Sequence, residues 1–261
     1  MSILQDLPFS LCQPGPDHVD GVGNYYLQVL GHTPSELPLL TLYLLDSHGE
    51  ISSQVQNPDY GWIKQSQMDW FTDTAQSLRK AREEQDGHDR FAHLSLAFMH
   101  IPLPEFAQSN LVITGGDRRE PTEGPSFNSR FYDILVKQGV AAVGCGHDHV
   151  NDFCGLLPHR LHGQHRRFQP NGETKKLGGP WLCYAGTSGF GGYGSYGGKY
   201  YHRRARIWDF DTKTGGIKTW KRVEYADHRI DETVLVKNGT VFTPLNAVDG
   251  DNSGSSAQVI L

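Results

Sequence analysis

The chain has 261 residues, which is long enough for one large domain with a buried core. Its net charge of −5 at pH 7 argues against the basic surface of a nucleic-acid-binding domain, so we expect no nucleic-acid partner. No apolar run approaches the ~20 residues that a membrane helix needs, so we expect no membrane partner. Four cysteines are too few for a disulfide framework in a chain of this length, which predicts reduced thiols and a cytoplasmic location.

The first half of the chain alternates strand-like and helix-like segments. Residues 22–31 and 37–49 are rich in aromatic and branched side chains and end in glycine, which predicts two strands. Apolar residues at three- and four-residue spacing predict an amphipathic helix over 66–85. Residues 93–106 predict another strand, which two prolines end shortly after His100.

The second half continues this alternation. Residues 110–124 have the composition of a loop, and a helix is predicted over 126–139 with Ser126 as its N-cap and Gly139 as its stop. Further strands are predicted at 140–145, 181–186 and 203–223, the last of them a hairpin. The order of strands and helices predicts an α/β fold.

The segment after residue 201 carries a basic cluster, which consists of His202, Arg203, Arg204 and Arg206. On a strand, alternation divides these side chains between two faces, so we predict a solvated surface. Beyond residue 245 the sequence is polar. We therefore expect one domain over residues 1–245 and a polar tail over 246–261.

Histidines follow two of the predicted strands. His100 comes after the strand in 93–106, and His147 and His149 follow the apolar run that ends at residue 145. Strand ends in α/β sheets are where ligands bind, and alternate residues of an extended loop point to the same side. Two glycines before His147 allow a sharp turn and a close backbone approach. The pattern predicts a metal site, with Asp148 as the hydrogen-bond acceptor that orients a ring.

Other interpretations of this region stay open. The two histidines of "GHDH" can also be solvated side chains of a polar loop. Cys145 and Cys154 flank the two histidines, and a structural zinc site with these four ligands is another interpretation. Their spacing matches no common zinc finger. Further along, Gly192-x-Gly194-x-x-Gly197 has the dinucleotide-binding spacing, but a strand follows it where that motif requires a helix.

Four segments together resemble a known family. They are "YGWIKQSQMDWF", "LAFMHIPLPEF", "EGPSFNSRFYDILVKQGVAAVGCGHDHVNDFCG" and "YAGTSGFGGYGSYGG". In this order they resemble the carboxyl-terminal half of the calcineurin-like metallophosphoesterases. The closer resemblance is to the branch related to purple acid phosphatases, which includes fungal cell-cycle-linked phosphatases. It extends from about Gly21 to Val223.

The resemblance implies a β-sandwich flanked by helices that holds two metal ions, of iron, zinc or manganese. It assigns His100 and His147 to the second metal and His149 to the first. Metal-activated water would attack the phosphorus of a phosphomonoester, and the substrate class includes phosphoproteins. We place Tyr193 and Tyr196 beside the substrate pocket.

The resemblance also implies three motifs ahead of the matching region. They are Asp-x-His, Gly-Asp-x-x-Asp and Asn-His followed by Asp or Glu, and we identify none of them in this chain. We therefore expect the general acid and the bridging carboxylate upstream of Met1, and a sheet that is incomplete at its amino-terminal side. The predicted function is a metal-dependent phosphoesterase that is impaired in this chain. The alternative is a non-catalytic remnant that binds one metal weakly or acts through protein contacts.

Overall fold

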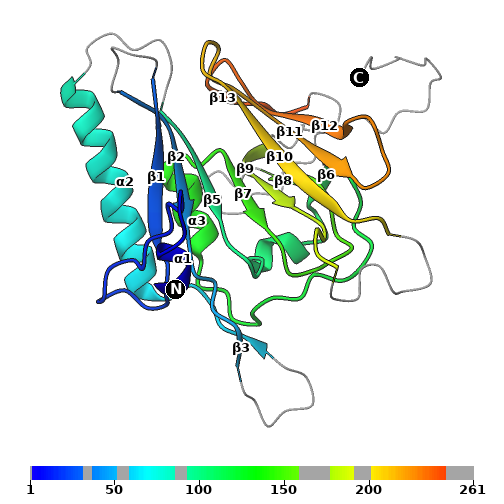
Figure 1. Cartoon of the computed structure of the whole chain (residues 1–261), viewed down its shortest axis with the longest axis horizontal. Helices are drawn as coiled ribbons and strands as arrows, with labels where there is room; N and C mark the ends of the chain where they lie inside the picture. Colours follow the sequence, from blue (N-terminus) through cyan, green and yellow to red (C-terminus); the bar gives the residue numbers. More distant parts are fainter. Residues whose placement is uncertain are drawn as a thin grey trace, which may run out of the picture.

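A seven-stranded mixed sheet forms the centre of the fold (Figure 1). In this computed structural model, residues 2–31, 37–51, 59–85, 93–158, 177–190 and 201–244 are described. In spatial order the central sheet consists of β1 (Tyr25–Leu30), β2 (Pro38–Leu44), β5 (Leu94–Phe98), β7 (Ala142–Cys145), β9 (Leu177–Tyr184), β8 (Cys154–Pro158) and β6 (Val112–Gly115). The α/β class predicted from the sequence is confirmed.

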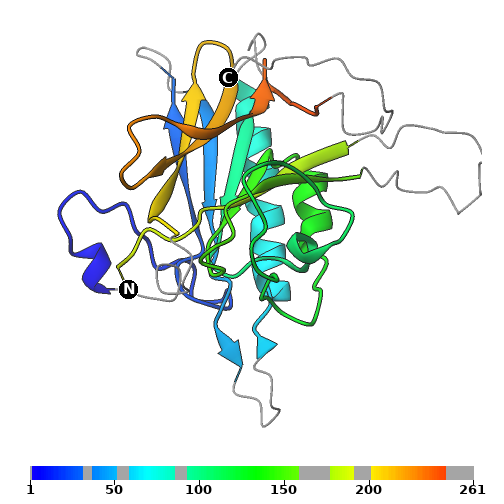
Figure 2. The same cartoon turned by 90° about the vertical axis from the view of Figure 1, so that its right-hand side faces the viewer.

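Helices cover one face of this sheet and a smaller sheet covers the other. A four-stranded sheet consists of β10 (Arg204–Asp211), β11 (Gly216–Val223), β12 (Ile230–Lys237) and β13 (Thr240–Val241). The others are α1 (Ser2–Gln5), the β3 (Glu50–Ile51) and β4 (Asp59–Tyr60) pair, α2 (Gln65–Gln85), the 3₁₀ helix η1 (Pro104–Ala107) and α3 (Phe131–Gln138). Figure 2 shows α2 and α3 on one side of the central sheet and the four-stranded sheet toward the other. None of the helices in the described ranges has the length and apolarity required to span a bilayer.

Four neighbouring strands, β2, β5, β7 and β9, run parallel to one another. Their carboxyl ends therefore meet along one edge of the sheet, which is the lower edge in Figure 1. Segments that are far apart in the sequence, after Leu44, Phe98 and Cys145, emerge there side by side. This edge is the place where an open α/β sheet forms a binding crevice.

Helix α2 packs its predicted apolar stripe on the central sheet. Phe71 is completely buried, and its ring lies 4.7 Å from that of Tyr43 on β2 and 5.3 Å from that of Phe131 on α3. Met68 and Ala75, at the same helical spacing, are buried in the same core. Burial of this stripe, together with a sequence free of glycine and proline, accounts for a helix of 21 residues.

The second core lies between the two sheets. The indole of Trp181 on β9 donates a hydrogen bond to the carbonyl of Leu235 on β12 at 3.0 Å. Gly144 on β7 leaves room for an edge-to-face contact between Phe98 and Trp208, whose ring centroids are 5.3 Å apart. A Cβ at Gly144 would lie 2.7 Å from the Phe98 ring, so this close approach requires glycine.

Two sequence-based boundaries are wrong. Within 110–124, which has the composition of a loop, β6 pairs antiparallel with β8, because Val112 and Ile113 find partners that are distant in sequence. Helix α3 begins at Phe131 rather than near Ser126, and its N-cap is Arg130. Ser126 instead donates its hydroxyl hydrogen bond to Asp59 at 2.6 Å. The predicted stop at Gly139 is confirmed, with φ at 73°.

The expectation of reduced thiols is contradicted by a disulfide between Cys154 and Cys183. The two residues are directly opposite each other on the antiparallel strands β8 and β9, 29 positions apart in the sequence. Cys145 is free and lies in the core beneath the helices, whereas Cys154 lies in the core between the sheets. A structural zinc site shared by Cys145 and Cys154 is therefore wrong.

His93 is a half-buried histidine at the start of β5, far along the strand from His100. We place its Nδ1 as the acceptor of Arg82 Nη1 at 3.1 Å and its Nε2–H as the donor to Thr41 at 2.9 Å. Burial first, and then the Arg82 cation, lower the pKa of His93 from 6.5 to about 4. The folded protein therefore excludes a proton that the unfolded chain binds.

Replacing Phe71 by Ala should lower the free energy of unfolding by roughly 3–5 kcal/mol, because a fully buried aromatic ring leaves a cavity between α2, α3 and β2. Urea denaturation measures the loss. Lys80→Ala is the matched control, since the Lys80 side chain is 78% exposed on the same helix. A Phe71→Ala loss no larger than that of the control would contradict this packing.

The stability of the wild type should fall as pH drops from 6.5 toward about 4, because protonation of His93 occurs first in the unfolded chain. His93→Gln should remove this component, on the order of 3 kcal/mol, and flatten the profile in that window. Stability measured by denaturation at several pH values tests it, with His228→Gln at an exposed position as control. Equal profiles for the wild type and His93→Gln would show that this imidazole does not govern the window.

Candidate metal site

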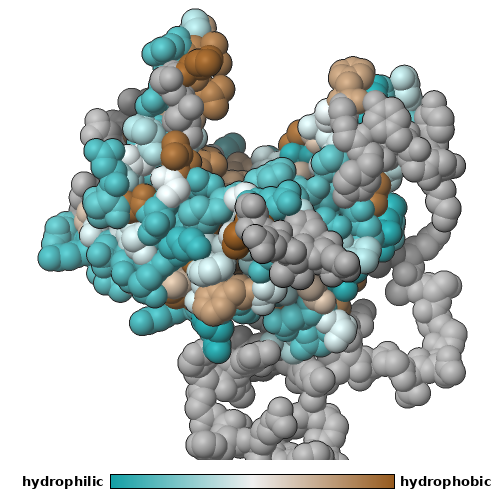
Figure 3. Space-filling model, turned by 90° about the horizontal axis from the view of Figure 1, so that it is seen from below, coloured by the Kyte–Doolittle hydropathy of each residue, from teal (hydrophilic) through white to brown (hydrophobic). Residues whose placement is uncertain are grey.

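The candidate site lies at the edge where the four parallel strands end. His100 follows β5, the segment from His147 to His149 follows β7, and a short loop that contains Asp46 follows β2. Seen from below, the described surface of this edge is mainly hydrophilic (Figure 3). The β-sheet thus brings polar side chains from three separate parts of the sequence to one face.

The predicted imidazoles lie close together. The ring centroids of His100 and His147 are 5.4 Å apart, at nearly a right angle. Burial lowers the pKa of His100, and the nearby His147 and His149 lower it further. Burial also lowers the pKa of His147, with His149 acting in the same direction. Neutral imidazoles, the form that binds metals, are therefore favoured at His100 and His147.

The turn that carries the histidines differs from the extended loop assumed in the sequence analysis. His147 itself has a φ of 72°, in the left-handed region, and the amide of Asp148 donates to the Gly146 carbonyl at 3.0 Å. Gly146 serves a close approach instead of the turn, because a Cβ there would lie 3.3 Å from Nδ1 of His100. Left-handed non-glycine residues concentrate at functional sites.

Carboxylates lie beside the histidines. Ligand atoms of Glu123, His147 and Asp148 are all within 4.8 Å of one another. Asp148 is buried and accepts hydrogen bonds from the Tyr184 hydroxyl and, at 3.2 Å, from the Glu123 amide. Burial raises the pKa of Asp148 to about 6, although the Tyr184 hydrogen bond acts in the opposite direction.

Asp148 accepts hydrogen bonds from Tyr184 and Glu123, and its role as the acceptor that orients a ring stays a prediction. Glu123 is a candidate that the sequence analysis missed. It lies in the segment 110–124 with no periodic pattern around it, so only the tertiary structure shows that it reaches His147.

The residues of this cluster fit a metal ion. Nε2 of His147 is buried and has no hydrogen-bond partner among the described residues, which is costly for an imidazole unless a ligand meets it. Imidazole nitrogens combined with carboxylate oxygens suit zinc, iron or manganese. The edge of the Tyr60 ring packs on His147 with centroids 4.6 Å apart and limits its rotation.

The expectation that the chain contains no Asp-x-His is wrong, because Asp46–His48 is such a triplet. Its middle residue, Ser47, accepts hydrogen bonds from the amides of His100 at 3.1 Å and Ile101 at 2.8 Å. The Asp46 carboxylate accepts from the amides of Val22 at 2.7 Å and His48 at 2.8 Å. In this structure the triplet braces the backbone that carries His100.

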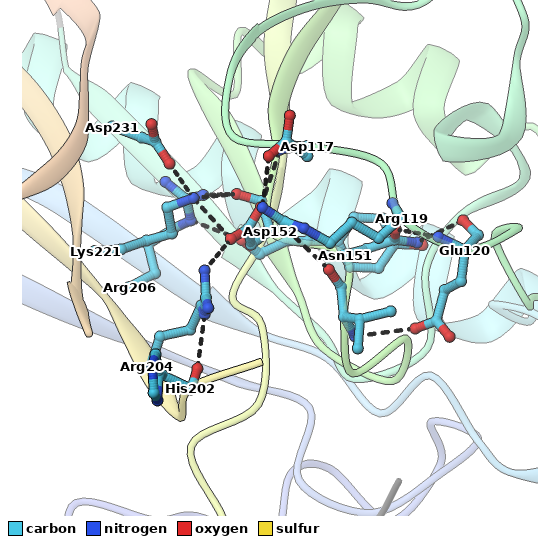
Figure 4. A network of polar contacts seen from close by, with 12 residues as sticks. Asp117, Arg119, Glu120, Asn151, Asp152, His202, Arg204, Arg206, Lys221 and Asp231 are labelled. Carbon is cyan, nitrogen blue, oxygen red and sulfur yellow. Dashed lines mark hydrogen bonds and ion pairs between the residues drawn. The ribbon is translucent and has the colours of Figure 1, made fainter. Parts of the chain in front are cut away.

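Asp152 lies in the loop 146–153, the histidine loop, and is the centre of a buried ionic network (Figure 4). Its fully buried carboxylate pairs with Arg119 at 2.7 Å, Arg204 at 2.6 Å and Lys221 at 2.8 Å. Its carbonyl accepts from Arg206 at 2.7 Å. Burial raises the pKa of Asp152, but the bonds from Lys221 and Arg119 outweigh it and hold the pKa well below its usual range.

The prediction of a solvated surface for the basic cluster is wrong for two of its members. Arg204 and Arg206 are two residues apart on β10, so both side chains point inward, and both reach Asp152. Arg206 also donates to the carbonyl of Tyr184 at 2.7 Å. Lys221 of β11 pairs in addition with Asp231. The network therefore joins the small sheet to the loop that follows the histidines.

Two other sequence motifs fall elsewhere. Asp117, in the segment between β6 and α3, supports this network, because its amide donates to Asp152 at 2.9 Å. Tyr193 and Tyr196 lie outside the described residues.

Comparison with known proteins shows relatives over most of the chain. It is 37% identical to the "Probable inactive purple acid phosphatase 29" of Arabidopsis thaliana, over 91% of this chain and 60% of that protein. It is 34% identical to the "Probable inactive purple acid phosphatase 14" of the same plant, over 92% of this chain and 60% of that protein. It is 34% identical to the "Phosphatase DCR2" of Saccharomyces cerevisiae, over 87% of this chain and 37% of that protein. No family model matches the chain.

Asp152→Asn should lower the free energy of unfolding by roughly 3–5 kcal/mol, because it leaves buried cations without their counter-charge. Chemical denaturation measures the change. Asp117→Asn, a matched change at a side chain that is 67% exposed, should cost less than about 1 kcal/mol. Similar losses for the two variants would show that the network contributes little.

Proposed function

We propose that this chain, which belongs to the metallophosphoesterase-related family of the purple-acid-phosphatase-like proteins, hydrolyses phosphomonoesters with a metal ion held beside His147. The observation that carries the proposal is the buried, unpartnered Nε2 of His147 within reach of two carboxylates. The chain spans about 60% of the length of its two plant relatives. The phosphatase activity is therefore proposed from the residues of this chain and is not inferred from those relatives.

The residues have separate roles in this proposal. His147, Asp148 and Glu123 would hold the ion, with His100 and His149 beside it. When bound, such an ion lowers the pKa of a water ligand and neutralises phosphoryl oxygens. Among the described residues, Glu123, His147 and Asp148 are the single cluster of three possible metal ligands. We therefore propose one ion for this chain rather than the two implied by the family resemblance.

Hydrogen bonds within the protein would orient the Asp148 carboxylate toward the ion. The Tyr184 hydroxyl fixes one oxygen of Asp148. The amide of Glu123 holds the same carboxylate, so the loop that carries Glu123 is tied to the loop that carries His147. The described surface of this edge is mainly hydrophilic (Figure 3), which suits a charged substrate, and the proposed substrates are phosphomonoesters, phosphoproteins included.

A second candidate function is metal binding without catalysis. One ion gives less stabilisation of the attacking and leaving oxygens than a pair of ions does. The names of the two plant relatives include the word inactive. The proposed single ion and these names favour a weak or absent phosphatase activity for this chain.

Titration of metal-stripped protein with Mn²⁺ or Zn²⁺ in a calorimeter tests the site. The wild type should bind one ion, and His147→Gln should weaken binding by at least about tenfold, because it removes a direct ligand. His18→Gln, at an exposed position, is the matched control and should bind as the wild type does.

Turnover of p-nitrophenyl phosphate at each metal concentration separates the two functions. Turnover that follows metal occupancy and disappears in His147→Gln supports the phosphoesterase. Stoichiometric metal without turnover supports the non-catalytic alternative. A wild type that binds no metal would overturn both.

A further inference from the structure

A pocket lies on the helix side of the central sheet, away from the candidate metal site. Its volume is about 340 Å³, and its walls come from η1, α3 and the neighbouring ends of β8 and β9. Its lining includes Glu105, Asn128, Arg130, Val136, Leu157 and Gly178. Gly178 lies at the amino end of β9, whereas the histidines follow the carboxyl end of the parallel strand β7. The pocket and the metal site therefore open at opposite ends of the strands.

Glu105 is a buried carboxylate with an unused oxygen in the wall of this pocket. It belongs to the "IPLPEF" segment after His100, and only 5% of its surface is exposed. Oε1 accepts a hydrogen bond from Asn128 Nδ2 at 2.7 Å, whereas Oε2 has no partner among the described residues. An unsatisfied buried polar atom is rare in a folded protein and calls for a specific reason.

The neighbouring polar groups are already engaged elsewhere. The Oδ1 of Asn128 accepts a hydrogen bond from the backbone amide of Arg130 at 2.8 Å. This bond fixes the Asn128 side chain, so it cannot rotate to donate a second hydrogen bond to Glu105. The guanidinium of Arg130 is bound to Asp133, with its Nε 2.6 Å from Oδ2. In the described part of the chain, Glu105 takes part in no ion pair.

The charge of the wall is consequently unbalanced. Glu105 and Asp133 carry carboxylates and Arg130 carries the guanidinium, which leaves one excess negative charge when all are ionised. Burial raises the pKa of Glu105, with the Asn128 hydrogen bond opposing it. A cationic group at Oε2 would relieve this unfavourable burial.

We propose that this pocket binds a small organic cation, an ammonium or guanidinium group on a short apolar stem, with the Glu105 carboxylate as its anchor. A guanidinium donates charge-assisted hydrogen bonds to a carboxylate in a fixed geometry. The volume is in the range of small-molecule sites and exceeds what one inorganic ion fills. Val136, Leu157 and Pro158 supply the apolar wall for the stem. This site goes beyond the proposed phosphoesterase function and does not depend on it.

Calorimetric titration with n-butylguanidinium and its neutral isostere n-butylurea tests the proposal. The protein is kept in EDTA, so that the result is independent of the metal site. We expect saturable binding of one n-butylguanidinium, and at least about tenfold weaker binding of n-butylurea, because the charge-assisted bond is lost.

Two variants locate the binding. Glu105→Gln keeps the acceptor for Asn128 and removes the charge, so affinity should fall at least about tenfold. Val136→Phe, in the apolar part of the lining, should abolish binding by filling the pocket. Glu83→Gln is the matched control, since it makes the same change at an exposed position on α2. Circular dichroism and thermal melts confirm that each variant is folded.

Several outcomes would overturn the proposal. They are the absence of saturable binding to the wild type, equal affinity for the guanidinium and the urea, and unchanged affinity in either Glu105→Gln or Val136→Phe. Because all these measurements are made without metal, they leave the phosphoesterase proposal untouched. Conversely, a protein that fails to bind Mn²⁺ or Zn²⁺ can still bind the cation.

Discussion

The ion pair between Asp152 and Lys221, both with fully buried side chains, is the interaction on which the rest of this structure depends. It places one carboxylate of the histidine loop against a cation from the small sheet, in an environment where removing either partner leaves an uncompensated charge. Arg204 and Arg206 add bonds from β10 to the same residue. The small sheet is thereby attached to the loop through charge as well as through the apolar core around Trp181.

The candidate metal site follows from this attachment and from strand direction. Parallel pairing of β5 with β7 sets His100 beside the histidine loop, and Ser47, in the loop after β2, accepts a hydrogen bond from the backbone of His100. Glu123 arrives from a segment without periodic structure and is held by Asp148. The site is therefore built from segments that are linked only when the central sheet has formed, which is typical of sites at the carboxyl ends of parallel strands.

The sequence was sufficient for elements whose pattern is local. The stripe that contains Phe71 defines α2, and the glycine at 139 ends α3, because helical periodicity and a left-handed C-cap are properties of a few neighbouring residues. It was insufficient where the partner is remote. Strand β6 depends on β8, the Cys154–Cys183 disulfide depends on strand register, and the inward position of Arg204 depends on Asp152, 52 residues away. The histidines could be selected from their motif, whereas Glu123 has no local signal.

The distance along the chain between Asp152 and Lys221 has a consequence for biosynthesis. The two residues are 69 positions apart, and the carboxylate is translated first. At ~5–20 residues per second, a ribosome needs roughly 3–14 s to deliver the lysine after the aspartate. During that interval the nascent histidine loop lacks its counter-cation from β11, so it must remain hydrated outside a closed core. The buried ion pair of the loop can therefore form only after β11 has been synthesised.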